Sequence, residues 1–192
     1  MQLTGVRIGF GITGSYCTIP EVIPELKRLR DEGAELFPIV SPQVLTTDTR
    51  FGKAEDLHRM ILEITGREPW RSLVEVEPIG PQKLLDVVVV APCTGSTLGH
   101  LALGLSNTPV TLACKAHLRN NRPVVVAIST NDGLGASLLN LALMLNRNWI
   151  YFVPFGQDDP TVKPKSLVAK MPQLTPTLIH ALQGQQLQPV LQ

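Results

Sequence analysis

Residues 86–97 read DVVVVAPCTGST, a run of four valines that ends in a turn of small and hydroxyl residues. A β-branched stretch without polar alternation predicts a strand at 86–91 that is buried on both faces, as at the centre of a parallel sheet. Thr94 in the turn can cap the N-terminus of a helix that runs to about Leu103. A strand, a turn and a helix in this order indicate one unit of an α/β fold.

The same alternation extends in both directions along the chain. Further strands are predicted at 6–10, 34–41, 123–129 and 149–154, with a weaker one at 73–76. Helices are predicted at 19–30, 53–65, 109–120, 135–146 and 175–182. We therefore expect one Rossmann-like domain over residues 1–192. It should be a three-layer α/β/α sandwich with a doubly wound, mostly parallel sheet and a less regular tail from about residue 154.

Composition and charge exclude several classes of function. The formal net charge of the 192 residues is +1, without blocks of like charge, so no nucleic-acid partner is expected. The apolar run LLDVVVVAPC is interrupted by Asp86 and is too short to span a bilayer, and the start MQLTGVRIGFG shows no secretory signal. The three cysteines form no C-x-x-C pair. These features predict a cytoplasmic protein with reduced thiols, no membrane partner and no metal site.

The residues that follow the predicted strands indicate where a ligand binds, because doubly wound sheets bind ligands at the carboxyl ends of their strands. These segments are GITGS (11–15), SPQ (41–43), PCTGST (92–97) and STND (129–132). They contain glycine, asparagine and hydroxyl residues, and no carboxylate before Asp132. Taken alone, each segment has the residue types that are common in any turn. Four of them at one sheet edge favour a phosphate site, since backbone amides at helix N-termini attract anions.

The segment GFGITG (9–14) matches the G-x-G-x-x-G pattern of dinucleotide-binding folds. That pattern requires an acidic residue at the far end of the second strand to hold the ribose. Glu35 has the right separation but lies at the start of its strand, and Ser41 stands at the far end. Gly9 is predicted inside the first strand and not in the turn. A mononucleotide phosphate is therefore favoured over a dinucleotide.

GITGS, Ser41 and VVVVAPCTGSTLGHLALGLSNTPVTLACKA (87–116) resemble the flavoprotein superfamily of homo-oligomeric FMN-binding enzymes. That superfamily includes phosphopantothenoylcysteine decarboxylase, the peptidyl-cysteine decarboxylases and the flavin prenyltransferases. APCTGST (91–97) stands where the decarboxylases carry A-P-A-S-A-N-T. The resemblance implies that FMN contacts Thr13, Gly14, Ser15, Ser41, Thr94, Gly95, Ser96, Thr97, Ser129, Thr130 and Asn131.

Within the superfamily, EPIGPQKLLDVVVVAPCTGST (77–97) and RPVVVAISTNDGLG (122–135) look like the family of dipicolinate synthase B subunits. This resemblance implies an oxidoreductase subunit that acts with an NAD(P)-binding A subunit. Together they would oxidise a dihydrodipicolinate-type small molecule to dipicolinate (pyridine-2,6-dicarboxylate) in the mother-cell cytoplasm during sporulation. It also implies a homo-oligomer with the flavin at a subunit interface.

Several departures from the superfamily pattern count against a decarboxylase or a prenyltransferase. The segment 74–82 lacks the histidine of the decarboxylases, and Ser96 replaces their asparagine. Ser129 and Thr130 stand where flavin prenyltransferases commonly have an Arg-Glu pair. The alternatives are a stand-alone FMN-dependent decarboxylase or prenyltransferase, and a non-catalytic flavin-binding structural subunit. No catalytic residue is assigned.

Single titratable residues near these turns add little. His100 is the only histidine near the predicted pocket, whereas His117 is interpreted as a cation at a helix C-terminus. Cys93 is interpreted as a small buried residue and not as a nucleophile. Asp132 is the first carboxylate at the sheet edge, where a role in the turn is an equal alternative.

Overall fold

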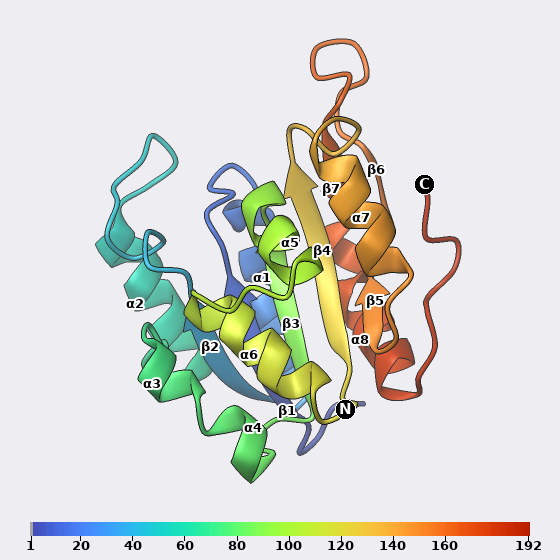
Figure 1. Ribbon diagram of the computed structural model, residues 1–192. Helices are drawn as coiled ribbons and strands as arrows, with labels where there is room; N and C mark the ends of the chain where they lie inside the picture. The colour runs from blue at the N-terminus through green and yellow to red at the C-terminus, as the bar shows by residue number, and fades with distance from the viewer. Residues whose placement is uncertain (1) are drawn as a thin grey trace.

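The protein is described here over residues 2–192 by a computed structural model, in which helices surround one seven-stranded sheet (Figure 1). The strands are β1 (Arg7–Ile12), β2 (Glu35–Val40), β3 (Val87–Cys93), β4 (Val124–Thr130), β5 (Ile150–Phe152), β6 (Phe155–Gln157) and β7 (Leu167–Ala169). The helices are α1 (Ile19–Asp31), α2 (Ala54–Thr65), α3 (Leu73–Val76), α4 (Ile79–Gln82), α5 (Gly95–Ala102), α6 (Pro109–Leu118), α7 (Ser137–Leu145) and α8 (Leu174–Leu182), with a 3₁₀ turn η1 (Met171–Gln173) before α8.

Five parallel strands in the order β2-β1-β3-β4-β5 form the main part of the sheet. The chain moves outward from β1 to β2 and then returns to place β3 on the other side of β1, so the strand order reverses between β1 and β3. Such a reversal leaves a crevice at the carboxyl ends of the strands, where open α/β sheets bind ligands. The Rossmann-like α/β fold expected from the sequence is confirmed.

Helices cover both faces of this sheet. The helices α5, α6 and α7 lie on the face toward the viewer in Figure 1, and α1 and α8 pack on the opposite face. All seven residues of β3 are buried, which agrees with the unbroken apolar run that predicted a central strand.

Two of the three glycines of the GFGITG motif, Gly9 and Gly11, allow close packing inside β1. A Cβ atom on Gly9 would lie 2.5 Å from Leu85 Cδ1, and one on Gly11 would lie 2.9 Å from Val110 Cγ1 of α6. Both glycines therefore let the neighbouring side chains approach the strand. The position of Gly9 within the strand is as predicted, whereas Gly11, expected in the turn, also belongs to β1.

The predicted strand at 73–76 is wrong, because this segment forms the short helix α3. Ser72 caps it: its hydroxyl accepts from the amide of Glu75, and the Glu75 carboxylate accepts from the amide of Ser72. This reciprocal capping box satisfies two helix-end donors and outweighs the β propensity of the two valines.

The chain after residue 154 is more ordered than the sequence predicted. The strands β6 and β7 form an antiparallel hairpin, and β7 continues the sheet beside β4 by pairing Val168 with Ser129 and Leu167 with Thr130. Thus β4 has β5 beside its first half and β7 beside its last residues. The hairpin rises above the strand ends at the top of Figure 1.

Candidate functional site

A polar cavity of about 680 Å³ opens at the carboxyl ends of β1, β3 and β4. This volume lies within the range of about 300–1,000 Å³ that is typical of small-molecule sites. Seven of the predicted contact residues line it: Gly14, Ser15, Thr94, Gly95, Ser129, Thr130 and Asn131. The structure therefore brings three of the four predicted turns together around one space.

A cluster of three hydroxyl groups forms the floor of the cavity where α1 begins. Ser129 Oγ lies 2.7 Å from Ser15 Oγ and 2.7 Å from Thr18 Oγ1, and the last two atoms are 3.2 Å apart. Thr18 occupies the N-cap position of α1, yet its side chain caps no amide of that helix. The three hydroxyls satisfy one another and can rotate toward an anionic ligand as donors. Thr18 was not predicted, because its neighbour Ser129 is remote in sequence.

Unpaired backbone amides add to the capacity of this turn for an anion. Within residues 2–192, no acceptor lies within hydrogen-bond reach of the amides of Gly14, Tyr16 and Cys17. The next amides, of Thr18 and Ile19, already donate to the Ser15 carbonyl. Free amides of a loop that enters a helix are the donors that commonly hold phosphate.

The other four predicted residues lie behind or beside the cavity. Thr13 is buried, and its hydroxyl donates to the Pro92 carbonyl over 2.6 Å and accepts from the Thr94 amide over 3.1 Å. It therefore joins the turns after β1 and β3. The Thr94 hydroxyl donates to Thr97 Oγ1 and accepts from the Thr97 amide, so Thr94 caps α5 as predicted. Ser41 donates to the Ile12 carbonyl, and Ser96 faces a shallower neighbouring cavity.

Asp132 ties the end of β4 to the start of α7. Its Oδ1 accepts from the hydroxyls of Thr130 and Ser137 at 2.5 and 2.8 Å. The hydrogen bond from Thr130, and after it the one from Ser137, keeps the pKa of the Asp132 carboxyl below its usual range. Asp132 is therefore ionised at neutral pH. Its negative charge lies beside Gly95 at the N-terminus of α5, where it already complements the helix dipole.

Half of the cavity wall comes from the C-terminal part of the chain, which sequence reasoning did not include. The lining residues of this part are Asp158, Lys163, Ser166, Val168, Ala169, Lys170, Met171, Pro172, Gln173 and Gln192. The two lysines are the cations among the lining residues. The pairing of β7 with β4 brings this wall to the strand ends, and the short three-residue strands of the hairpin gave no periodic signal that could predict it.

The other titratable candidates lie outside the polar cavity. Cys93 is buried, as predicted, and burial raises the pKa of its thiol far above the ordinary value. The interpretation of His117 as a helix-end cation is wrong: the ring is buried and burial lowers its pKa to about 4, so it is neutral. His100 lines the shallow cavity beside Ser96 and Asp132, outside the polar cavity. Within residues 2–192 no cluster of three or more acidic, histidine or cysteine side chains could hold a metal ion.

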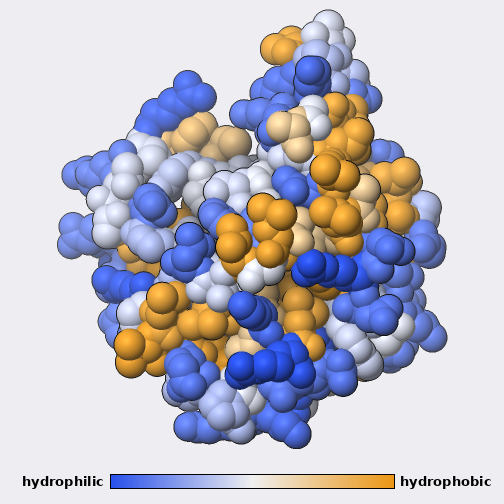
Figure 2. All heavy atoms as spheres, in the orientation of Figure 1, coloured by the Kyte–Doolittle hydropathy of each residue, from blue (hydrophilic) through white to orange (hydrophobic). Residues whose placement is uncertain are grey.

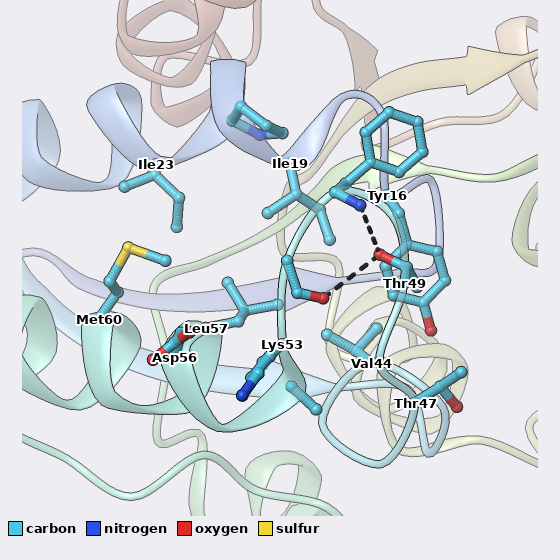
Figure 3. Close-up of a pocket in the computed structure, with 14 residues that line it drawn as sticks. Tyr16, Ile19, Ile23, Val44, Thr47, Thr49, Lys53, Asp56, Leu57 and Met60 are labelled. Atoms are coloured by element: carbon cyan, nitrogen blue, oxygen red, sulfur yellow. Dashed lines mark hydrogen bonds between the residues drawn. The ribbon is translucent and has the colours of Figure 1, made fainter.

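A second, smaller cavity of about 260 Å³ lies on the other side of the turn after β1 (Figure 3). Ile19 and Ile23 of α1 face Leu57 and Met60 of α2 across it, and Tyr16 borders it. The Tyr16 hydroxyl donates to the Gln43 carbonyl and so ties the turn after β1 to the turn after β2. The lining of this cavity is mostly apolar, with Thr47, Thr49, Lys53 and Asp56 as its polar side chains besides Tyr16.

Comparison with known proteins assigns the class of this chain. The Flavoprotein family model matches residues 1–147, and the chain belongs to that family. It is 49% identical over 190 residues to the B subunit of dipicolinate synthase from Bacillus subtilis (strain 168), covering 99% of this chain and 95% of that protein.

Solved structures agree with this assignment. The crystal structure of the dipicolinate synthase B subunit from Bacillus halodurans C is 47% identical, has a TM-score of 0.92 and covers 100% of this chain and 98% of that one. The FMN-dependent cysteine decarboxylase SpaF has a TM-score of 0.65 at 20% identity, covering 92% of this chain and 95% of that one. The second likeness supports the fold alone. In residues 2–192, moreover, no helix has the length and apolar character to cross a membrane.

Proposed function

We propose that this chain is an FMN-binding subunit of a dipicolinate synthase. The observation that carries the proposal is the polar cavity whose floor combines the Ser15–Thr18–Ser129 hydroxyl cluster with free amides. A chain of this family, 49% identical to a dipicolinate synthase B subunit, has its donors at the sheet edge where a mononucleotide is expected.

The residues present fit a flavin mononucleotide in one orientation. The turn 13–18 offers hydroxyl and amide donors, and its cavity-facing hydroxyls contact only one another, Ser129 and Cys17. The N-terminus of α5, in contrast, already has the Asp132 carboxylate beside it. Like charges repel most strongly where water is scarce. The phosphate is therefore assigned to the turn 13–18, and the ring system to the space toward Thr94 and Asn131.

When bound, a flavin supplies the capacity to accept or donate electrons. The protein then has to bind and orient it. Thr13 fixes the distance between two turns, the hydroxyl cluster donates to the phosphate, and the hairpin β6–β7 covers the cavity from the side. Among the strand-end turns the one carboxylate is Asp132, and it is held ionised by two donors.

We further propose that the partner is an NAD(P)-binding A subunit and that the two chains oxidise a dihydrodipicolinate-type intermediate to dipicolinate. The related protein is named as the B chain of its enzyme, which supports the need for a second subunit. The expected setting is sporulation, in the cytoplasm of the mother cell.

A homo-oligomer is also proposed, with the flavin near an interface between copies. Exposed leucines gather on the face that carries α5 and α7 (Figure 2), and they are Leu103, Leu105, Leu134, Leu138, Leu139, Leu143 and Leu145. Leu103 and Leu139 each leave 69% of their surface accessible. Apolar patches of this kind mark interfaces in soluble proteins. The patch borders Gly95 and Ser96, so a second copy placed on it would approach the cavity.

A second candidate function is a flavin-binding subunit that positions the cofactor while its partner performs the chemistry. It is favoured because the residues that line the polar cavity include no histidine. A stand-alone decarboxylase or prenyltransferase has less support, because 74–82 contains no histidine and Ser129 and Thr130 carry no charge.

Titration of the purified chain with FMN, followed by quenching of flavin fluorescence, tests the proposal. Saturable binding is expected, with at least tenfold weaker binding for Ser129→Ala and unchanged binding for Thr161→Ala on the hairpin loop. A protein that shows no saturable binding of FMN would refute the cofactor assignment. Adding A subunit and NADP to the reduced substrate then separates the two candidates: if product formation needs this chain but persists without FMN, the flavin is not the catalyst.

A further inference from the structure

The charged side chains that line the polar cavity differ in whether they form ion pairs. Its lining includes two carboxylates, Glu21 and Asp158, and two ammonium groups, Lys163 and Lys170. The Lys163 ammonium lies 2.7 Å from Asp158 Oδ2, so these two neutralise each other. For Lys170, the described chain places no carboxylate within ion-pair distance.

The backbone of Lys170 is fixed although its side chain is exposed. The Lys170 amide donates to the Pro154 carbonyl over 2.8 Å, and its carbonyl accepts from the Gln173 amide over 2.8 Å. The preceding residue, Ala169, is paired with Phe155 inside the hairpin. Only the four-carbon stem and the ammonium are left to move, which lowers the entropy cost of holding the charge in one place.

Lys170 lies in a continuous segment that borders the cavity beside the hydroxyl cluster. Residues 168–173, which run from β7 through η1, all line the cavity. Val168 is the partner of Ser129, which is the central member of the hydroxyl cluster. Lys170 lies two residues after the residue opposite Ser129, at the N-cap of η1, and η1 packs against α1, the helix that begins after Thr18.

We propose that Lys170 is the charge-compensating residue for an oxyanion group of the ligand, bound between the hydroxyl cluster and the C-terminal wall. The shared chemistry is a phosphate monoester or a carboxylate, and the phosphate of FMN and a carboxylate of dipicolinate are its two sources. Ser15, Thr18 and Ser129 would donate hydrogen bonds to the oxyanion, and the Lys170 ammonium would balance its charge. The inference rests on the proposed function and adds a recognition residue that lies outside the part matched by the family model.

The test compares ligands that differ in the anionic group alone. The affinities of wild-type protein, Lys170→Gln and Lys170→Arg are measured by flavin fluorescence quenching, with FMN and with riboflavin, which lacks the phosphate. Lys165→Gln on the same hairpin is the matched control, because Lys165 is exposed and does not line the cavity. Pyridine-2,6-dicarboxylate is titrated calorimetrically as a third probe, with urea midpoints as a check on folding.

If Lys170 compensates the phosphate, Lys170→Gln weakens FMN binding about tenfold, as expected for a charged hydrogen bond. Riboflavin binding then changes less than twofold, and Lys170→Arg restores most of the affinity. If it compensates a carboxylate, the loss appears with pyridine-2,6-dicarboxylate and not with FMN. Equal losses for FMN and riboflavin, or no change with any probe, would overturn the inference. Wild-type protein that binds neither flavin would instead refute the proposed function.

Discussion

At the scale of single residues, Thr13 shows how one buried hydroxyl positions a site without lining it. It bonds at once to the Pro92 carbonyl and to the Thr94 amide, and so sets the spacing of two turns. Its presence among the predicted ligand contacts came from a sequence resemblance, whereas the structure gives it a positioning role.

Replacing this hydroxyl by a methyl group of the same shape tests that role. Thr13→Val leaves a carbonyl and an amide unsatisfied in a buried region, which costs about 1–3 kcal/mol of unfolding free energy. The midpoint of urea unfolding should fall accordingly, and FMN affinity should fall as the two turns separate. Thr161→Val on the exposed hairpin loop should unfold like the wild type; an equal loss there would contradict the explanation.

His117 makes the stability of the protein depend on pH. The ring is buried, its Nε2 has no partner within residues 2–192, and burial lowers its pKa from 6.5 to about 4. Between these values the unfolded chain binds a proton that the folded chain does not, so stability falls as the pH decreases below 6.5. The loss approaches about 3 kcal/mol near pH 4.

Urea unfolding between pH 7 and pH 5 measures this slope, in a range above that in which the aspartates protonate. His117→Gln should flatten the pH dependence, whereas His180→Gln on α8 should keep the wild-type slope. An unchanged slope in His117→Gln would show that another group is responsible.

Some residues could be predicted from the sequence and others could not, for a physical reason. The turns after β1, β3 and β4 follow obvious buried strands, so their donors were found. Thr18 and Lys170 join the cavity through contacts between residues that are far apart in the sequence. The Thr18 hydroxyl hydrogen-bonds to Ser129, and Val168, two residues before Lys170, pairs with Ser129 in the sheet. Such long-range pairings leave no local pattern.

At the scale of elements, the start of α5 packs closely against the turn after β4. A Cβ atom on Gly95 would lie 2.6 Å from Thr130 Oγ1 and 2.8 Å from Ser137 Oγ, the two donors that hold Asp132. The helix can therefore begin close to the turn after β4 because position 95 has no side chain.

Gly95→Ala should displace that pair of hydroxyls and destabilise the protein by about 1–3 kcal/mol, as overpacked cores do. Gly99→Ala, one turn later in α5, meets Asn140 Nδ2 at 3.3 Å and should stay within about 1 kcal/mol of wild type, since alanine favours helix. Thermal unfolding of the two variants compares them. If Gly95→Ala were as stable as Gly99→Ala, the close approach would not constrain the site.

Elements also show the limits of pattern reasoning. The segment 73–76 contains two valines, which favour a strand, but a capping box at Ser72 makes it helical. Elements with a strong signal, such as the amphipathic α1 and the unbroken valine run of β3, were predicted within a few residues. Strands of three residues, β6 and β7, are too short to show a period and depend on pairing with each other and, for β7, with β4.

At the scale of the whole molecule, the exposed leucines of α5 and α7 predict the mode of self-association. Leu139→Glu places a charge in the centre of that face and should shift the protein to a smaller species in light scattering after gel filtration. Val162→Glu, equally exposed but on the hairpin loop, should leave the assembly unchanged. An assembly that survives Leu139→Glu would place the interface elsewhere.

The two sides of the polar cavity differ in origin. The part of the chain that the family model matches ends at residue 147, and the wall opposite the hydroxyl cluster is formed after residue 154. During synthesis on the ribosome the turns that we propose bind the phosphate therefore emerge first, and the cavity gains its second wall only when roughly the last forty residues have folded onto β4. Under the proposed function, a nascent chain would offer the flavin only an open half-site. Relatives with the same first 147 residues but another tail would share the cofactor and differ in what they bind beside it.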